Sequence, residues 1–199
     1  PDKYNRNAWD DDETNDEQWP YRVKFLGTDL LGNVTIPEGV PTDVETSLEV
    51  SLDASSESYP LHTFNLLNDG VMEKIAKAFK LQPSEIASAT LEAGVVKAEG
   101  FTGPADGKVA VGLTNPDGKV SYAYSANGIG FWIAADGTAS SWGDAPIYYE
   151  YDAVGYGLTV GHNPGHSEKG KTYTIKPTMV YNKGGKLHKA VITIKMKFA

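Results

Sequence analysis

Three turns of one kind divide the middle of this chain into short segments. Asp-Gly pairs occur in PADGK (104–108), NPDGK (115–119) and AADGT (134–138), each between two apolar runs. Such a pair favours a β-hairpin, because tight hairpin turns need residues that tolerate positive φ. The pattern predicts a meander of short strands: Val109–Leu113, Val120–Tyr124, Phe131–Ala134, Thr138–Trp142 and Ile147–Tyr151.

The C-terminal segment alternates clearly between apolar and polar residues. In Val191–Phe198, one parity is apolar (Ile192, Ile194, Met196 and Phe198), and the other contains Thr193, Lys195 and Lys197. This pattern is typical of a sheet with one face buried and one in water. Tyr173–Tyr181 precedes it across the turn NKGGK, so the two segments predict a hairpin. Pro177 predicts an edge or a bulge within the first of them.

Shorter strand patterns come earlier in the chain. In Tyr21–Leu26, the apolar residues Tyr21, Val23 and Phe25 alternate with Arg22 and Lys24, which predicts a strand. Two further strands are predicted from alternation or β-branched residues: Val34–Ile36 and Leu48–Leu52. Pro37 and Pro41 favour an edge or a loop between them.

One region has helical periodicity, from Asn68 to Ala89. Asn68 or Asp69 is expected to cap the first helix, and Pro83 suits the first turn of a second. Two helices packed on a sheet would bury Ile75, Phe79, Leu81 and Ile86. The segment also has the look of a DNA-binding helix-turn-helix, but the positions expected to read DNA carry no Lys or Arg: Ser84, Glu85, Ala87 and Ser88.

Charge and composition narrow the class of protein. Residues 1–20 contain seven acidic residues against Lys3 and Arg6, a net charge of −5, so the remaining chain contributes −3 to the total of −8. This balance argues against nucleic-acid partners and against direct binding to anionic membranes. The chain contains no cysteine, which excludes disulfides and thiol chemistry.

The chain is expected to form one domain with an N-terminal extension. Residues 1–19 are predicted to be an acidic, disordered tether, and residues 20–199 a single β-rich domain. Because the sequence begins with Pro1, a signal peptide is expected to have been removed. The predicted fold class is α+β, mostly β: an antiparallel β-sandwich with a short helical hairpin packed on one side.

Several sequence blocks resemble a known family. They are YSANGIGFWIAADGTASSWG, IYYEYD and VGHNPGHSEKGKTYTI, followed by a final VITIKMKF strand. Over roughly residues 44–199 the chain resembles the DUF4859 family, a β-rich module of secreted and surface lipoproteins in gut Bacteroidetes. It departs from the family pattern at His162, where a Gln-like residue is expected, and at His166, where Cys is common.

The resemblance implies a location and a context, but no activity. It implies a secreted, outer-membrane or cell-surface lipoprotein, with the periplasm as the alternative. Membrane attachment would be made only through an upstream lipid anchor that this sequence does not contain. The family context also implies glycan handling, by association alone.

Aromatic and polar residues within the resembling region form a candidate glycan-binding surface. Sugars stack their C–H faces on aromatic rings and bond their hydroxyls to carboxylates and amides. If Phe131, Ile133, Ile147, Tyr149 and Tyr151 face the core, alternation places their neighbours outward. The candidate ligand-binding residues are Trp132, Trp142, Tyr148, Glu150, Asp152, His162 and Asn163. The alternative is that both tryptophans are core residues.

Metal binding and catalysis are poorly supported by the sequence. His162 and His166 are four residues apart, but Asn163-Pro164-Gly165 predicts a turn rather than a helical ligand pair. No metal or cofactor site is therefore predicted, and a structural Ca²⁺ ion stays open as an alternative. No catalytic motif is present, so no catalytic residue is assigned.

The predicted function is a non-catalytic, surface-tethered module that binds a glycan weakly through its aromatic face. Two alternatives remain open at the level of sequence. One is a structural or adhesive module that contacts a protein partner in a surface glycan-uptake system. The other is an uncharacterised hydrolase, for which Glu150 and Asp152, about 7 Å apart along one strand, are an unspecific carboxylate pair.

Overall fold

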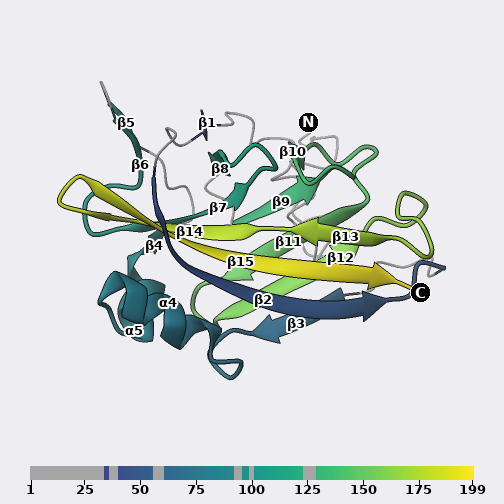
Figure 1. Cartoon of the computed structure of the whole chain (residues 1–199), viewed down its shortest axis with the longest axis horizontal. Coiled ribbons are helices and arrows are strands. Elements are labelled where there is room, and N and C mark those ends of the chain that lie inside the picture. Colours follow the sequence, from purple (N-terminus) through teal and green to yellow (C-terminus); the bar gives the residue numbers. More distant parts are fainter. Residues whose placement is uncertain (1–33, 36–39, 56–60, 92–95, 99–100, 123–128) are drawn as a thin grey trace, which may run out of the picture.

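The computed structural model describes residues 34–35, 40–55, 61–91, 96–98, 101–122 and 129–199. The predicted tether (1–19) and the predicted strand Tyr21–Leu26 lie outside these residues. Two β-sheets packed face to face make up most of the described chain, and two short helices lie at one end (Figure 1). The predicted fold, a mostly β sandwich with a helical hairpin, is confirmed.

Eight strands form the larger sheet, in the order β1-β8-β7-β14-β15-β13, with β2 beside β15 and β4 beside β7. Its strands are β1 (Val34–Thr35), β2 (Thr42–Leu52), β4 (Thr90–Leu91), β7 (Val109–Thr114), β8 (Val120–Tyr122), β13 (Thr172–Ile175), β14 (Pro177–Lys183) and β15 (Lys186–Phe198). The predicted strand Tyr173–Tyr181 is interrupted at Lys176, which separates β13 from β14. Pro177 begins β14, which pairs with both β7 and β15, so the edge or bulge predicted there is wrong. Most pairs are antiparallel, but β2–β15 and β4–β7 are parallel.

The second sheet has five strands in the order β10-β9-β11-β12-β3, all antiparallel. Its strands are β3 (Leu61–Asn65), β9 (Ile129–Ile133), β10 (Ala139–Ser140), β11 (Ile147–Asp152) and β12 (Gly157–His162). A separate two-stranded hairpin joins β5 (Val96–Ala98) to β6 (Phe101–Gly103). The predicted strand Thr138–Trp142 is shorter in the structure. Because β10 ends at Ser140, Trp142 lies in the connection between β10 and β11.

The helices are α4 (Val71–Phe79) and α5 (Pro83–Ala89). Pro83 begins α5, as predicted. The predicted cap of α4 is wrong: its N-cap is Gly70, at φ 76°, with no side-chain cap. The turn before the helix is instead held by Asn65, whose Oδ1 accepts the backbone N–H of Leu67 at 3.1 Å and of Asn68 at 2.9 Å.

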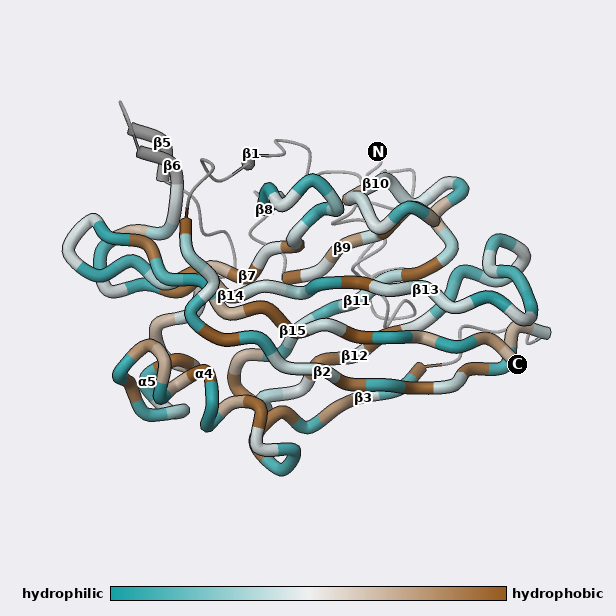
Figure 2. The backbone as a smooth tube through the Cα atoms, in the orientation of Figure 1, coloured by the Kyte–Doolittle hydropathy of each residue, from teal (hydrophilic) through white to brown (hydrophobic). Residues whose placement is uncertain are grey.

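The core lies between the two sheets and continues under the helices. Apolar side chains from both sheets and from the buried face of the helix pair belong to one cluster, including Ile75, Ile86, Phe131, Tyr149 and Ile194. The Tyr149 hydroxyl donates a hydrogen bond to the Gly112 carbonyl of β7 and so ties the sheets together. Along β2 and β15 the backbone alternates between apolar and polar residues, as a sheet with one wet face requires (Figure 2).

The Asp-Gly turns occur where they were predicted, but the predicted meander is wrong: β7 and β8 belong to the larger sheet, whereas β9, β10 and β11 belong to the smaller one. The turns at 115–119 and 134–138 join paired strands, whereas the turn at 104–108 joins β6 to β7, which belong to different sheets. Gly107, Gly118 and Gly137 all have positive φ, at 75°, 86° and 91°. Asp117 and Asp136 each accept the backbone N–H two residues later, at 2.9 Å and 3.0 Å. The short Asp side chain therefore holds the turn, and Gly supplies the left-handed residue.

Candidate functional site

All seven predicted ligand-binding residues lie in the five-stranded sheet or at one end of it. Trp132 lies in β9, whereas β11 contains three of them: Tyr148, Glu150 and Asp152. His162 ends β12, and Asn163 is the next residue. Trp142 lies in the connection 141–146 between β10 and β11.

Four of these residues share one face of the sheet, opposite to the face that holds Phe131 and Tyr149: Trp132, Tyr148, Glu150 and Asp152. We call it the outer face. Tyr148 is opposite Trp132, and Glu150 is opposite Gly130, in the register of β11 and β9. The Trp132 and Tyr148 rings have centroids 4.7 Å apart at an interplanar angle of 51°. Alternation along the strands therefore predicted correctly which residues share this outer face.

The expectation that this face exposes its aromatic residues is wrong for Trp132 and Tyr148. Both side chains are 0% exposed. Strands β10 and β11 flank β9 and are both antiparallel to it, with Ser140 beside Trp132 and Ile147 beside Ile133. The six residues 141–146 therefore connect strands that lie on opposite sides of β9, and we call this connection the crossover. Alternation placed the Trp132 and Tyr148 rings on the outer face, but it did not predict their burial there.

The Tyr148 ring packs against the neighbouring strand β12. A Cβ atom built on Gly161 would lie 2.7 Å from both Cζ and Oη of Tyr148. The ring therefore rests directly on the Gly161 backbone, the residue opposite it in register. Trp132 and Tyr148 are consequently parts of a packed layer on the outer face, not an open stacking platform.

Asn163 anchors the crossover. Its Nδ2 donates hydrogen bonds to the carbonyl of Gly143 at 3.2 Å and to that of Trp142 at 3.5 Å. Its backbone N–H donates to the Pro146 carbonyl oxygen at 2.8 Å, and Asn163 itself is only 3% exposed. Asn163 therefore holds the loop that carries Trp142 and is itself inaccessible to a large ligand.

Trp142 is the exposed aromatic residue of the predicted set, with 46% of its surface accessible. Asp144 lies two residues further along the crossover and is fully exposed. The Nδ1 atom of His166 is 4.0 Å from Oδ1 of Asp144. We call Trp142, Asp144 and His166 the Trp142 patch. Sequence reasoning did not include Asp144 or His166 among the ligand-binding residues, although Asp144 lies only two positions from Trp142.

His162 and Asp152 do not belong to the Trp142 patch, because each side chain interacts with residues elsewhere. The His162 side chain lies on the inner face, is 0% exposed, and has its ring centroid 5.5 Å from that of Phe198. Its Nδ1 hydrogen-bonds with the hydroxyl of Ser167. Asp152 is exposed, and its Oδ1 accepts the Val154 N–H at 3.0 Å within the turn after β11. The seven predicted residues therefore do not converge on one surface.

Glu150 is the polar residue of the outer face with the most unusual environment. It is half-buried, and burial raises its pKa from 4.5 to about 7. Next to it in register is Thr159, whose hydroxyl is 2.8 Å from the hydroxyl of Thr63 on β3. A carboxyl group with this pKa changes its charge near neutral pH, so small changes in its burial or in nearby charges alter the protonation state of Glu150.

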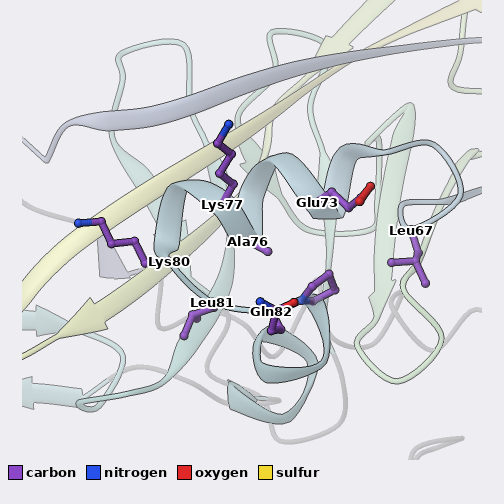
Figure 3. Close-up of a pocket in the computed structure, with 8 residues that line it drawn as sticks. Leu67, Glu73, Ala76, Lys77, Lys80, Leu81 and Gln82 are labelled. Carbon is purple, nitrogen blue, oxygen red and sulfur yellow. The ribbon is translucent and has the colours of Figure 1, made fainter.

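A groove of about 780 Å³ lies away from these residues, on the helix pair (Figure 3). It is lined by Leu67, Glu73, Ala76, Lys77, Lys80, Leu81, Gln82 and Pro83. Figure 3 shows Lys77 and Lys80 extending away from Gln82, so their ammonium groups do not converge over the groove. None of the seven predicted ligand-binding residues lines this groove.

Among the described residues, no group of three or more His, Cys, Asp or Glu side chains is arranged to hold a metal ion. Within the same residues, neither helix is long and apolar enough to cross a membrane.

Comparison with known proteins gives a family but no described relative. The family model described as a domain of unknown function (DUF4859) matches residues 58–186, which is more than half of the chain. The match falls within the region where the sequence blocks resemble that family. No curated protein matches the chain. No solved structure matches it either.

Proposed function

Because the chain belongs to the DUF4859 family, whose description assigns no activity, we propose a function from the geometry of its surface. We propose that it is a non-catalytic module that binds carbohydrate weakly through the Trp142 patch. The observation that carries the proposal is the 46% exposure of Trp142 on an anchored loop. Of the large apolar side chains that the described chain leaves exposed, Trp142 is the one aromatic residue.

The patch combines two features that sugars use. An exposed indole ring offers a flat apolar face for the C–H groups of a pyranose ring. Asp144 and His166 lie close to each other and supply polar groups that bond sugar hydroxyls. Asn163 donates hydrogen bonds to two carbonyl groups of the loop and so restrains it. The loop therefore loses little conformational entropy when a ligand binds.

The proposed affinity is low because the patch is small. The patch contains one large aromatic ring, that of Trp142, since Trp132 and Tyr148 are buried and contribute no stacking surface. We place the module on the cell surface, tethered through a segment upstream of the β-rich domain. Weak binding suits such a location, where many copies act on one polymer.

A glycan array followed by calorimetric titration tests the proposal. Trp142→Ala is expected to lose at least about tenfold in affinity, equivalent to about 1.4 kcal/mol, because the stacking surface disappears. Leu67→Ala is the matched control: Leu67 is 40% exposed and lies in the turn before α4 instead. Its affinity should equal that of the unmodified protein. A chain that binds no glycan, or a Trp142→Ala variant that binds normally, would contradict the proposal.

A further inference from the structure

Strand β2 has one edge to which no described strand pairs. It runs parallel to β15 over ten residue pairs, and β15 pairs on its other edge with β14 and β13. Among the residues that the structure describes, β2 has no partner besides β15. It lies at the lower edge of the larger sheet (Figure 1). An open edge of eleven residues offers a row of backbone donors and acceptors to an added strand.

The side chains along this edge define what an added strand should look like. On the inner face, Val44, Leu48 and Val50 are only partly buried against the core. On the outer face, Glu45 and Glu49 are exposed. Glu49 lies 3.3 Å from Lys197, but both side chains are more than half exposed, so this ion pair is weak. A fitting strand therefore has apolar residues on one face and basic residues on the other.

Two copies of β2 would not suit each other. An antiparallel β2–β2 pair centred on Ser47 would place Glu45 of one copy opposite Glu49 of the other. Like charges directly opposite each other destabilise a strand pair. The acidic edge thus disfavours self-pairing and selects a basic partner.

This chain itself contains a segment of the required pattern. Tyr21–Leu26 reads YRVKFL, with three apolar residues on one parity and Arg22 and Lys24 on the other. We propose that Tyr21–Leu26 of a second copy of this chain adds as a strand to the open edge of β2. Its apolar face covers the half-buried row of Val44, Leu48 and Val50. Its basic residues lie against Glu45 and Glu49.

The length of the connecting chain favours exchange between copies. Strand β1 begins at Val34 and lies five strand spacings from β2, so a strand added beyond β2 would lie six spacings away. At about 4.8 Å a spacing, this is about 29 Å. The eight steps from Leu26 to Val34 also reach about 29 Å only when fully extended. Within one copy, the linker would have to run straight across a twisted sheet, whereas a second copy imposes no such limit.

Charge reversal in the full-length chain tests the proposal. The edge variant is Glu45→Lys with Glu49→Lys, and the segment variant is Arg22→Glu with Lys24→Glu. Light scattering after size exclusion, at up to about 100 µM, reports the oligomeric state. The unmodified chain is expected to dimerise. Each variant alone should dimerise at least about tenfold more weakly, because its edge and its segment carry the same sign of charge.

An equimolar mixture of the two variants is the decisive sample. In the mixture, the basic edge of one variant meets the acidic segment of the other, and the acidic edge meets the basic segment. Dimers should therefore return to the level of the unmodified chain, which pairing within one copy cannot produce. Asp69→Lys with Glu73→Lys is the charge-matched control and should dimerise normally, because Asp69 lies in the turn before α4 and Glu73 in the first turn of α4. A monomeric unmodified chain, or a mixture that stays monomeric, would overturn the proposal.

Discussion

Trp132 and Tyr148 face each other across β9 and β11, with ring centroids 4.7 Å apart, and both are fully buried on the outer face of their sheet. The crossover 141–146 follows β10 and contains Trp142, which is 46% exposed. The two candidate tryptophans therefore have different environments: Trp132 is buried in the sheet, and Trp142 is exposed on a loop.

Trp132→Ala should destabilise the protein strongly. Removing a fully buried indole leaves a cavity beside Tyr148, and such changes cost about 3–5 kcal/mol. Trp142→Ala removes a half-exposed ring and should change the free energy of unfolding by less than about 1 kcal/mol. Urea unfolding of both variants measures the difference. Equal losses would mean that Trp132 does not support the layer described above.

Gly112→Ala should disrupt the contact between β7 and β8. A Cβ atom at this position would lie 2.6 Å from the Ser121 carbonyl oxygen and 2.7 Å from Cγ1 of Val120. A backbone oxygen cannot move aside without shifting the strand, so we expect a loss of about 1–3 kcal/mol. Gly143→Ala is the control, since nothing lies within 4 Å of its Cβ position. Thermal unfolding of both variants checks this, and a similar melting temperature for the two would contradict it.

Local signals in the sequence predicted most of the fold. Asp-Gly turns specify their geometry within four or five residues, and Gly107 and Gly118 adopt the left-handed conformation that such turns need. Alternation likewise predicted the inward set of β9 and β11, including Phe131 and Tyr149, whose rings stack 5.6 Å apart. These features depend on near neighbours, and a single sequence records them.

Features that depend on distant segments were not predicted. The parallel pairing of β2 with β15 joins residues nearly 150 positions apart, such as Leu48 and Ile194, and no local pattern encodes it. The burial of Trp132 is another such feature, because its ring is 0% exposed on a face that alternation predicted to be open. Parity assigns a face of the sheet, but only the topology determines whether that face is covered.

Asn163→Ala should loosen the crossover without unfolding the sheet. The substitution leaves the carbonyl groups of Trp142 and Gly143 without their shared donor, at a cost of about 1–3 kcal/mol. A looser loop should raise the accessibility of Trp142, which acrylamide quenching of tryptophan fluorescence detects. Comparison with the double variant Asn163→Ala/Trp142→Phe assigns any added quenching to Trp142. Unchanged quenching in Asn163→Ala would show that Asn163 does not anchor the loop.

Glu150 should make the stability of the protein depend on pH. Burial raises its pKa from 4.5 to about 7, so between these values the folded state binds more protons than the unfolded state. Stability should therefore fall as pH rises from about 4.5 through 7, by an amount on the order of 2 kcal/mol after allowance for partial exposure. Glu150→Gln removes the titrating group while keeping the shape, and should abolish this part of the slope. Urea unfolding at pH 5 and pH 8 measures it, with Asp152→Asn, at an exposed position on the same face, as the control that should retain the slope. If Glu150→Gln and the unmodified chain lose equal stability between these pH values, another group is responsible.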